Sequence, residues 1–151
     1  EKKTELSSIE DTISEKFSIL KKKDKYLRKF MPRGYILRLD LNEDHWLTYG
    51  AGEKAPAIFS GKDVYLSKRP VETAARFSEA DELRVSGLLW KEAKQRLKNS
   101  AYLTRESLGK GQIILFADDP NFRSYFYGTQ RLFLNSIFFG PGFGTDQPID
   151  W

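Results

Sequence analysis

The stretch that decides the predicted fold is Ile113-Ile114-Leu115-Phe116-Ala117, followed at once by Asp118-Asp119-Pro120. An apolar run without polar alternation is typical of a central strand that is covered on both faces. An aspartate cap with a proline at the first helical position then favours a helix start. The pattern therefore predicts a buried strand that passes directly into a long helix, which Gly140-Pro141 ends.

Upstream of this stretch, the sequence predicts further strands and a short helix. Residues 35–41 alternate, with Leu37, Leu39 and Leu41 on one face, as in a half-buried strand. Further strands are predicted at 57–59, 64–66, 73–77 and 102–107, with the first two joined as a hairpin. A helix is predicted over 88–98, with Trp90, Ala93 and Leu97 on one face. The long helix is expected to bury Phe122, Phe126, Thr129, Phe133 and Ile137.

These elements predict an α/β fold that is sheet-rich, with a mixed sheet and flanking helices. We divide the chain into a polar helical lead-in or linker at 1–30 and a domain segment at 31–151. A strand covered on both faces needs layers on both sides, and the chain offers few helices for this. We therefore expect either an incomplete domain or a domain that packs against a partner, for example by self-association through an uncovered sheet face.

The composition favours a non-catalytic role. The chain has 151 residues, no cysteine and a single histidine, His45. These counts exclude disulfides, a cysteine nucleophile and any site that needs two imidazoles, which includes most zinc sites. The sequence contains no apolar run long enough to predict a membrane span.

The positive charge is concentrated in the N-terminal segment. Residues 1–34 contain ten Lys and Arg against six Asp and Glu, whereas the rest is balanced, which argues against a nucleic-acid-binding face. The cluster Lys21-Lys22-Lys23-Asp24-Lys25 suggests either an anion-binding patch or a solvated linker or helix end, and we favour the second. A modest amphipathic stripe runs through Leu6, Ile9, Ile13, Phe17 and Leu20. Because the sequence starts at Glu1, we expect a piece of a longer protein.

The densest polar cluster is Asp40-Leu41-Asn42-Glu43-Asp44-His45. Its start resembles a calcium-binding EF-hand loop, but His45 and Ala51 occupy the positions that require Gly and Glu. We therefore interpret it as a turn after a strand. A metal-binding or general-base role for His45 would need the nearby carboxylates of Asp40, Glu43 and Asp44, but a packed or capping residue is the interpretation we favour.

A third candidate site lies where the predicted central strand ends. Ligands of open α/β sheets bind at that edge, so Asp118, Asp119, Asn121 and Arg123 are candidate ligand-binding residues. The alternative is a helix start that caps itself, because the two aspartates repel external anions. We favour this structural interpretation and expect no catalytic and no metal-binding residues in the chain.

Three segments in order carry a resemblance to a known family. They are Asp44-His45-Trp46-Leu47-Thr48-Tyr49-Gly50, Ser86-Gly87-Leu88-Leu89-Trp90, and the run from Gly109 to Asn135 that contains Asp119-Pro120-Asn121-Phe122-Arg123. Residues 31–145 resemble the C-terminal part of a class I glutamine amidotransferase-like domain. The closest resemblance is to the version fused C-terminally to bacterial zinc carboxypeptidases of the carboxypeptidase A type.

The resemblance implies the second half of a flavodoxin-like domain. Amidotransferases of this class use a cysteine and a His-Pro-Glu triplet, which here is Asp119-Pro120-Asn121. Without the nucleophile and base, the chain is expected to be a non-catalytic accessory or scaffold segment. The resemblance also implies a parent carboxypeptidase that is periplasmic or secreted and whose zinc lies in a separate upstream domain. It implies no cofactor in this chain. The expected partners are the parent's upstream domains.

Overall fold

The computed structural model describes residues 16–27, 29, 34–61 and 63–143 of the chain. Residues 16–27 are helical. The strands are β1 (Tyr35–Leu41), β2 (Lys54–Phe59), β3 (Glu72–Phe77), β4 (Arg84–Ser86), β5 (Ala101–Leu108) and β6 (Gly111–Phe116). The other helices are α2 (Lys91–Leu97) and α3 (Gln130–Phe139), with short 3-10 helices η1 (Trp46–Thr48) and η2 (Phe122–Ser124).

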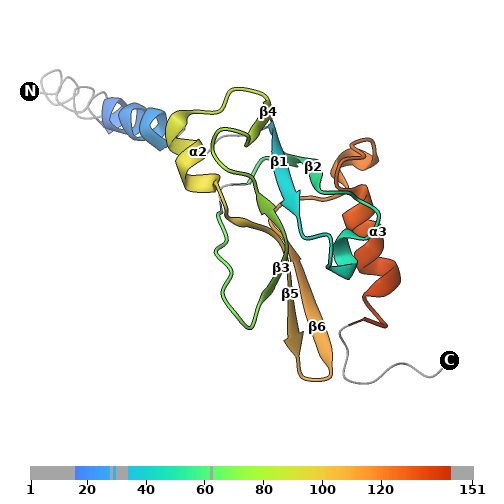
Figure 1. The fold of residues 1–151 in the computed structure, drawn as a ribbon. Coiled ribbons are helices and arrows are strands. Elements are labelled where there is room, and N and C mark those ends of the chain that lie inside the picture. Colours follow the sequence, from blue (N-terminus) through green and yellow to red (C-terminus); the bar gives the residue numbers. More distant parts are fainter. Residues whose placement is uncertain (1–15, 28, 30–33, 62, 144–151) are drawn as a thin grey trace, which may run out of the picture.

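The strands form one antiparallel sheet in the order β2-β1-β3-β5-β6, with β4 paired to β1. The sheet curls strongly into a half-barrel, and α3 lies along one side of it (Figure 1). The prediction of a mixed sheet belonging to a flavodoxin-like domain was therefore wrong. Parallel neighbours need long crossover connections, whereas here β5 and β6 are joined through Gly109 and Lys110 alone.

The apolar strand β6 lies at the edge of the sheet and not at its centre. Ile114 and Phe116 face α3, where Ile114 approaches Gly140 and the Phe116 ring packs against the Phe133 ring. Ile113 and Leu115 face the opposite side and are 48% and 43% exposed. The missing alternation therefore reflects one covered face and one exposed apolar face.

Most of the other predicted strands are confirmed. β1 buries Leu37, Leu39 and Leu41 as the alternation indicated, and the strands predicted at 57–59, 73–77 and 102–107 lie within β2, β3 and β5. The hairpin predicted for 64–66 was wrong, since Tyr65 forms only an isolated bridge with Ala101. The predicted helix at 88–98 is the shorter α2, which buries Ala93 and Leu97 but leaves Trp90 45% exposed.

The long helix begins ten residues later than the sequence predicted. Arg123 and Ser124 adopt left-handed backbone angles, with φ of 51° and 55°, which an α-helix does not tolerate. The backbone at Gly128 then approaches Pro56 so closely that a Cβ there would lie 2.3 Å from the Pro56 carbonyl oxygen. α3 ends at Gly140 as predicted, but it buries Leu132 and Asn135, and leaves Ile137 52% exposed.

The core lies inside the curl of the sheet. Edge-to-face aromatic contacts connect its strands to α3, through Phe59, Phe77, Tyr102, Phe116 and Phe133. Asn135 attaches α3 to the segment after β1, because its buried side-chain amide donates to the carbonyl oxygens of Leu47 and Tyr49 at 3.0 and 2.9 Å. This attachment places α3 beside η1.

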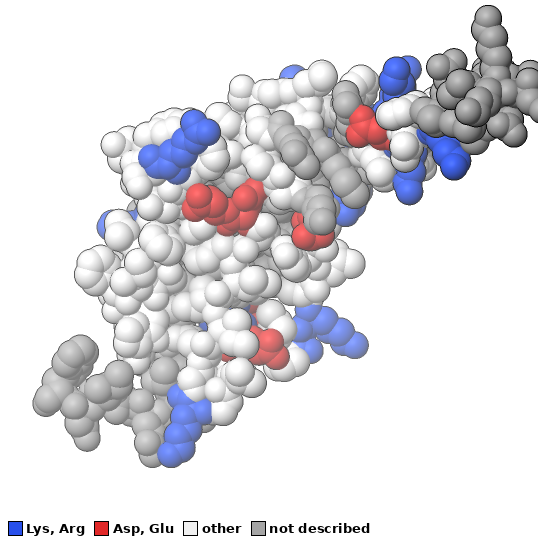
Figure 2. All heavy atoms as spheres, turned by 180° about the vertical axis from the view of Figure 1, so that it is seen from behind, with Lys and Arg blue, Asp and Glu red and all other residues white. Residues whose placement is uncertain are grey.

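The helix at 16–27 projects from the body next to α2 (Figure 1). Its apolar Phe17 and Leu20 are 60% and 59% exposed, and Lys21–Lys25 lie on its surface, where Figure 2 shows basic side chains beside the N-terminal segment. Leu6, Ile9 and Ile13 of the expected stripe lie outside the described residues. Among those residues, no helix combines the length and apolar character needed to cross a membrane.

Candidate functional site

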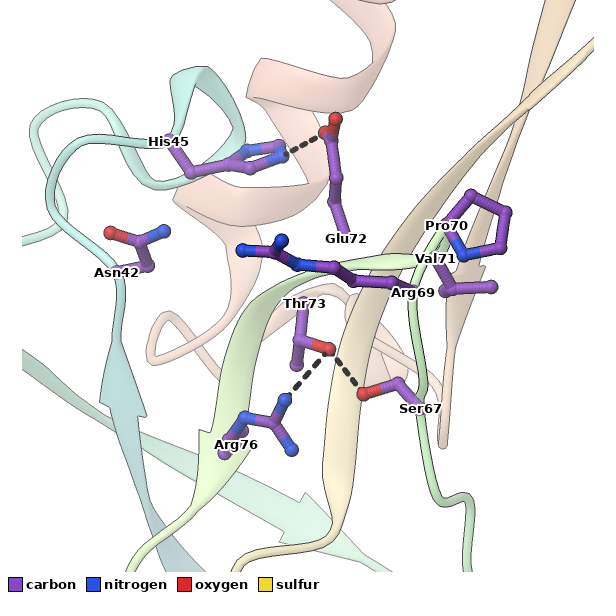
Figure 3. Close-up of a pocket in the computed structure, with 9 residues that line it drawn as sticks. All are labelled: Asn42, His45, Ser67, Arg69, Pro70, Val71, Glu72, Thr73 and Arg76. Carbon is purple, nitrogen blue, oxygen red and sulfur yellow. Dashed lines mark hydrogen bonds and ion pairs between the residues drawn. The ribbon is translucent and has the colours of Figure 1, made fainter.

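A pocket of about 890 Å³ opens where the turn after β1 meets the segment that leads into β3. We call it the basic pocket, and Figure 3 shows its side chains. Two of them come from the turn, four from residues 67–71, and three from β3. They are Asn42, His45, Ser67, Arg69, Pro70, Val71, Glu72, Thr73 and Arg76.

The basic pocket contains one cation that no described residue neutralises. Arg69 extends across the pocket in the direction of Asn42 (Figure 3), and its guanidinium has no hydrogen bond or ion pair within the described part of the chain. Arg76 is held in place, because it donates to Thr73 Oγ1 at 3.2 Å and to the Asn99 carbonyl oxygen at 3.3 Å. The two guanidinium groups therefore give this pocket a positive lining.

Glu72 supplies the negative charge of the pocket, and both of its carboxylate oxygens have a partner. Its Oε1 atom lies 3.3 Å from Arg105 Nη1, and its Oε2 atom lies 3.3 Å from His45 Nε2. Arg105 is nearly buried and also donates from Nε to Gln112 Oε1 at 2.8 Å. The Glu72 carboxylate is therefore already paired, which leaves Arg69 and Arg76 as the pocket's available charges.

Both ring nitrogens of His45 are engaged. Nδ1 accepts the backbone N–H of Leu47 at 3.1 Å, which caps η1, so in the neutral ring the proton lies on Nε2 and is donated to Glu72. Burial lowers the pKa of His45, the Glu72 hydrogen bond and charge oppose this shift, and Arg105 adds to it. The capping interpretation of His45 is confirmed, and neither nitrogen is open to a reacting group.

The surrounding groups provide hydrogen-bond donors and not an activated nucleophile. The hydroxyl groups of Ser67 and Thr73 are hydrogen-bonded to each other. Within the described ranges, no three His, Asp or Glu side chains converge in a way that could hold a metal ion. An arrangement of guanidinium, amide and hydroxyl donors is suited to binding an anion.

The strand-end residues predicted as a ligand site do lie together, and they bond mainly to their neighbours. Asp118 follows β6, and its Oδ2 accepts the backbone N–H groups of Ser60 and Gly61, the latter at 2.9 Å. Its Oδ1 accepts the Asp119 N–H at 2.8 Å. Asp118 thus connects the end of β6 to the end of β2.

The other strand-end residues bond locally as well. Asp119 Oδ1 accepts the Asn121 N–H at 2.9 Å, and Asn121 Oδ1 accepts from Gln130 Nε2 at 3.0 Å. Arg123 lies over the Phe122 ring, 5.3 Å from its centroid. The predicted self-capped helix start was wrong, because α3 begins at Gln130 and the aspartates stabilise a turn instead.

Sequence reasoning singled out Asn42 and His45 but missed the pocket residues that come from 67–76. It considered Asp40, Glu43 and Asp44 as partners of His45, whereas the actual partner is Glu72, 27 residues away. The predicted turn after the strand is confirmed for residues 42–45, where the Asp44 N–H donates to Asn42 Oδ1 at 3.3 Å, whereas Asp40 and Leu41 belong to β1. No local pattern marks Arg69 or Glu72, because their role depends on how β3 pairs. Comparisons with protein-family models, curated proteins and solved structures found no match to this chain.

Proposed function

We propose that this chain is a non-catalytic accessory segment and that it binds a small anionic group in the basic pocket. The observation that carries the proposal is Arg69, whose guanidinium extends into the pocket without a partner in the described part of the chain. A carboxylate or phosphate oxygen is the natural partner of such a group, because a guanidinium presents two parallel donors. Arg76 and the Asn42 amide offer further donors around the same space.

The direct test is titration with acetate, succinate and inorganic phosphate, followed by calorimetry and by backbone amide NMR shifts. We expect at least one of these anions to shift amides of residues 67–76. Arg69→Gln should weaken that binding about tenfold or more, since a charged hydrogen bond contributes about 1.5–3 kcal/mol. Lys68→Gln is the matched control, because it removes the same charge from the adjacent exposed residue outside the pocket lining.

Two results would contradict the binding proposal. One is that none of the anions shifts the pocket amides. The other is that Lys68→Gln weakens binding as much as Arg69→Gln, which would indicate general charge attraction. The strand-end site stays a prediction from sequence. A screen of small molecules followed by Asp119→Ala tests it, because specific binding that this change abolishes would favour that site over the pocket.

From the sequence resemblance, we further propose a parent protein that is a zinc carboxypeptidase, periplasmic or secreted, with its zinc in a separate upstream domain. This part rests on the resemblance alone, and the flavodoxin-like fold that the resemblance implied was wrong. Zinc analysis and a peptidase assay on this chain and on its full-length parent test it. Stoichiometric zinc with turnover in this chain would contradict the accessory role, and a parent without zinc would remove the carboxypeptidase assignment.

A further inference from the structure

The two edges of the sheet differ in chemistry. The edge strand β2 contains Pro56, which lacks an N–H, and Lys54, and both features discourage pairing with another strand. β6 contains neither proline nor charge, and among the described residues it pairs only with β5. An uncharged apolar edge strand of this kind is a ready template for another strand.

The hydrogen bonds of β6 show which backbone groups point to that free edge. The Ala117 N–H donates to the Tyr102 carbonyl oxygen at 2.8 Å, in continuation of the register that pairs Phe116 with Leu103. In an antiparallel ladder, alternate residues direct both backbone groups to the same neighbour. Gly111, Ile113 and Leu115 therefore face β5, whereas Gln112, Ile114 and Phe116 direct their N–H and C=O groups outward.

We propose that β6 pairs with β6 of a second copy of this chain, antiparallel, across a two-fold axis at Ile114. This register places Gln112 opposite Phe116 of the second copy, and Ile114 opposite Ile114. Each of these pairs exchanges two hydrogen bonds, so all the outward backbone groups of the strand are satisfied. Because the axis is perpendicular to the sheet, the same surface forms both halves of the interface.

Charge favours this register over its neighbours. With the axis at Ile114, continuing the register past the strand ends brings Lys110, in the turn before β6, near Asp118, in the bend after β6 of the other copy. Asp118 is held in position by the backbone N–H groups of Ser60 and Gly61. An axis at Ile113 or Leu115 would place Lys110 opposite Phe116 or opposite Pro120, and the charge match would be lost.

The side chains on both faces are consistent with the same register. On the exposed face, Ile113 lies opposite Leu115 of the second copy, and pairing would cover these half-exposed residues. On the other face, the C-terminal end of α3 lies over β6, where Gln112 Nε2 donates to the carbonyl oxygens of Gly140 and Phe143 at 2.5 and 2.6 Å. The two-fold axis keeps both α3 helices on this one face.

The first test is the oligomeric state, measured by sedimentation equilibrium. We expect a dimer, and Lys110→Glu should raise its dissociation constant about tenfold, because it replaces an attraction with a repulsion at both ends. Lys98→Glu is the matched control, with the same charge change on an exposed lysine after α2. Leu115→Lys should abolish the dimer while circular dichroism shows that each variant is folded.

The second test measures the register, and it exploits the absence of native cysteine. Ile113→Cys and Leu115→Cys chains are prepared separately and mixed under mild oxidation. Opposed residues of a non-hydrogen-bonded pair have Cα atoms about 4.5 Å apart, within disulfide range, whereas two Ile113 positions would be about 8 Å apart. We expect the mixed disulfide to form faster than either homodimer.

Three results would overturn the proposal. A monomer at the highest soluble concentration would show that no second copy of the chain pairs with β6. Preferential cross-linking of Ile113→Cys with itself would place the axis elsewhere. Equal weakening by Lys98→Glu and Lys110→Glu would show that the association does not use the ends of β6.

Discussion

The strand-end cluster and the basic pocket are both polar, but they use their polar groups differently. In the strand-end cluster, Asp118, Asp119 and Asn121 satisfy one another and the nearby backbone. In the basic pocket, Glu72 is paired with residues from other segments, and Arg69 is left without a described partner. The comparison shows that a dense polar sequence can be structural, while a binding site can be assembled from scattered residues.

The largest expected effect is on the strand-end cluster. Asp118→Ala removes the acceptor of the Ser60, Gly61 and Asp119 N–H groups, and we expect the free energy of unfolding to fall by about 2 kcal/mol. Urea unfolding measures this, with the exposed Asp81→Ala as the control. If both variants were equally stable, the cluster would not have the structural role that its bonds indicate.

A smaller effect is expected at Glu72, which connects the pocket to its supporting residues. Glu72→Gln should lower the free energy of unfolding by about 1 kcal/mol, because it removes the Glu72 carboxylate from the nearly buried Arg105. The same change should lower the pKa of His45 further, since Glu72 opposes the effect of burial. Proton NMR of the single histidine measures that pKa, and an unchanged value would contradict the contact.

The pocket is also expected to make stability dependent on pH. The pKa of His45 is lower in the folded than in the unfolded chain, so the unfolded state binds its proton first as the pH falls. The contribution of His45 is therefore complete above its ordinary pKa of 6.5 and is lost as the pH falls through the folded-state pKa. We expect His45→Gln to flatten this decline in urea unfolding between neutral and mildly acidic pH.

The smallest expected effect on stability is at Arg69. Because no described residue bonds to its side chain, Arg69→Gln should change the free energy of unfolding by less than about 0.5 kcal/mol. The same urea titration compares it with Asp118→Ala. A loss as large as that of Asp118→Ala would show that Arg69 is structural, and the distinction between the two regions would fail.

Local patterns were sufficient where both partners are close in sequence. The alternation of β1 and the capping role of His45 both depend on residues within a few positions of each other. Such features follow from backbone geometry and short-range hydrogen bonds. They were predicted without knowledge of the rest of the fold.

The sequence by itself determined that β6 is apolar on both sides, and only the tertiary structure decided that it is an edge strand. Periodicity reports which side chains are apolar, but not which segments arrive to cover them. In the same way, Glu72 and Arg105 were brought together only through the pairing of β3 with β5. Likewise, the left-handed backbone at Arg123 excludes the helix start that Asp118, Asp119 and Pro120 predicted. Long-range strand pairing, which no short motif encodes, therefore decided both the fold and the candidate site.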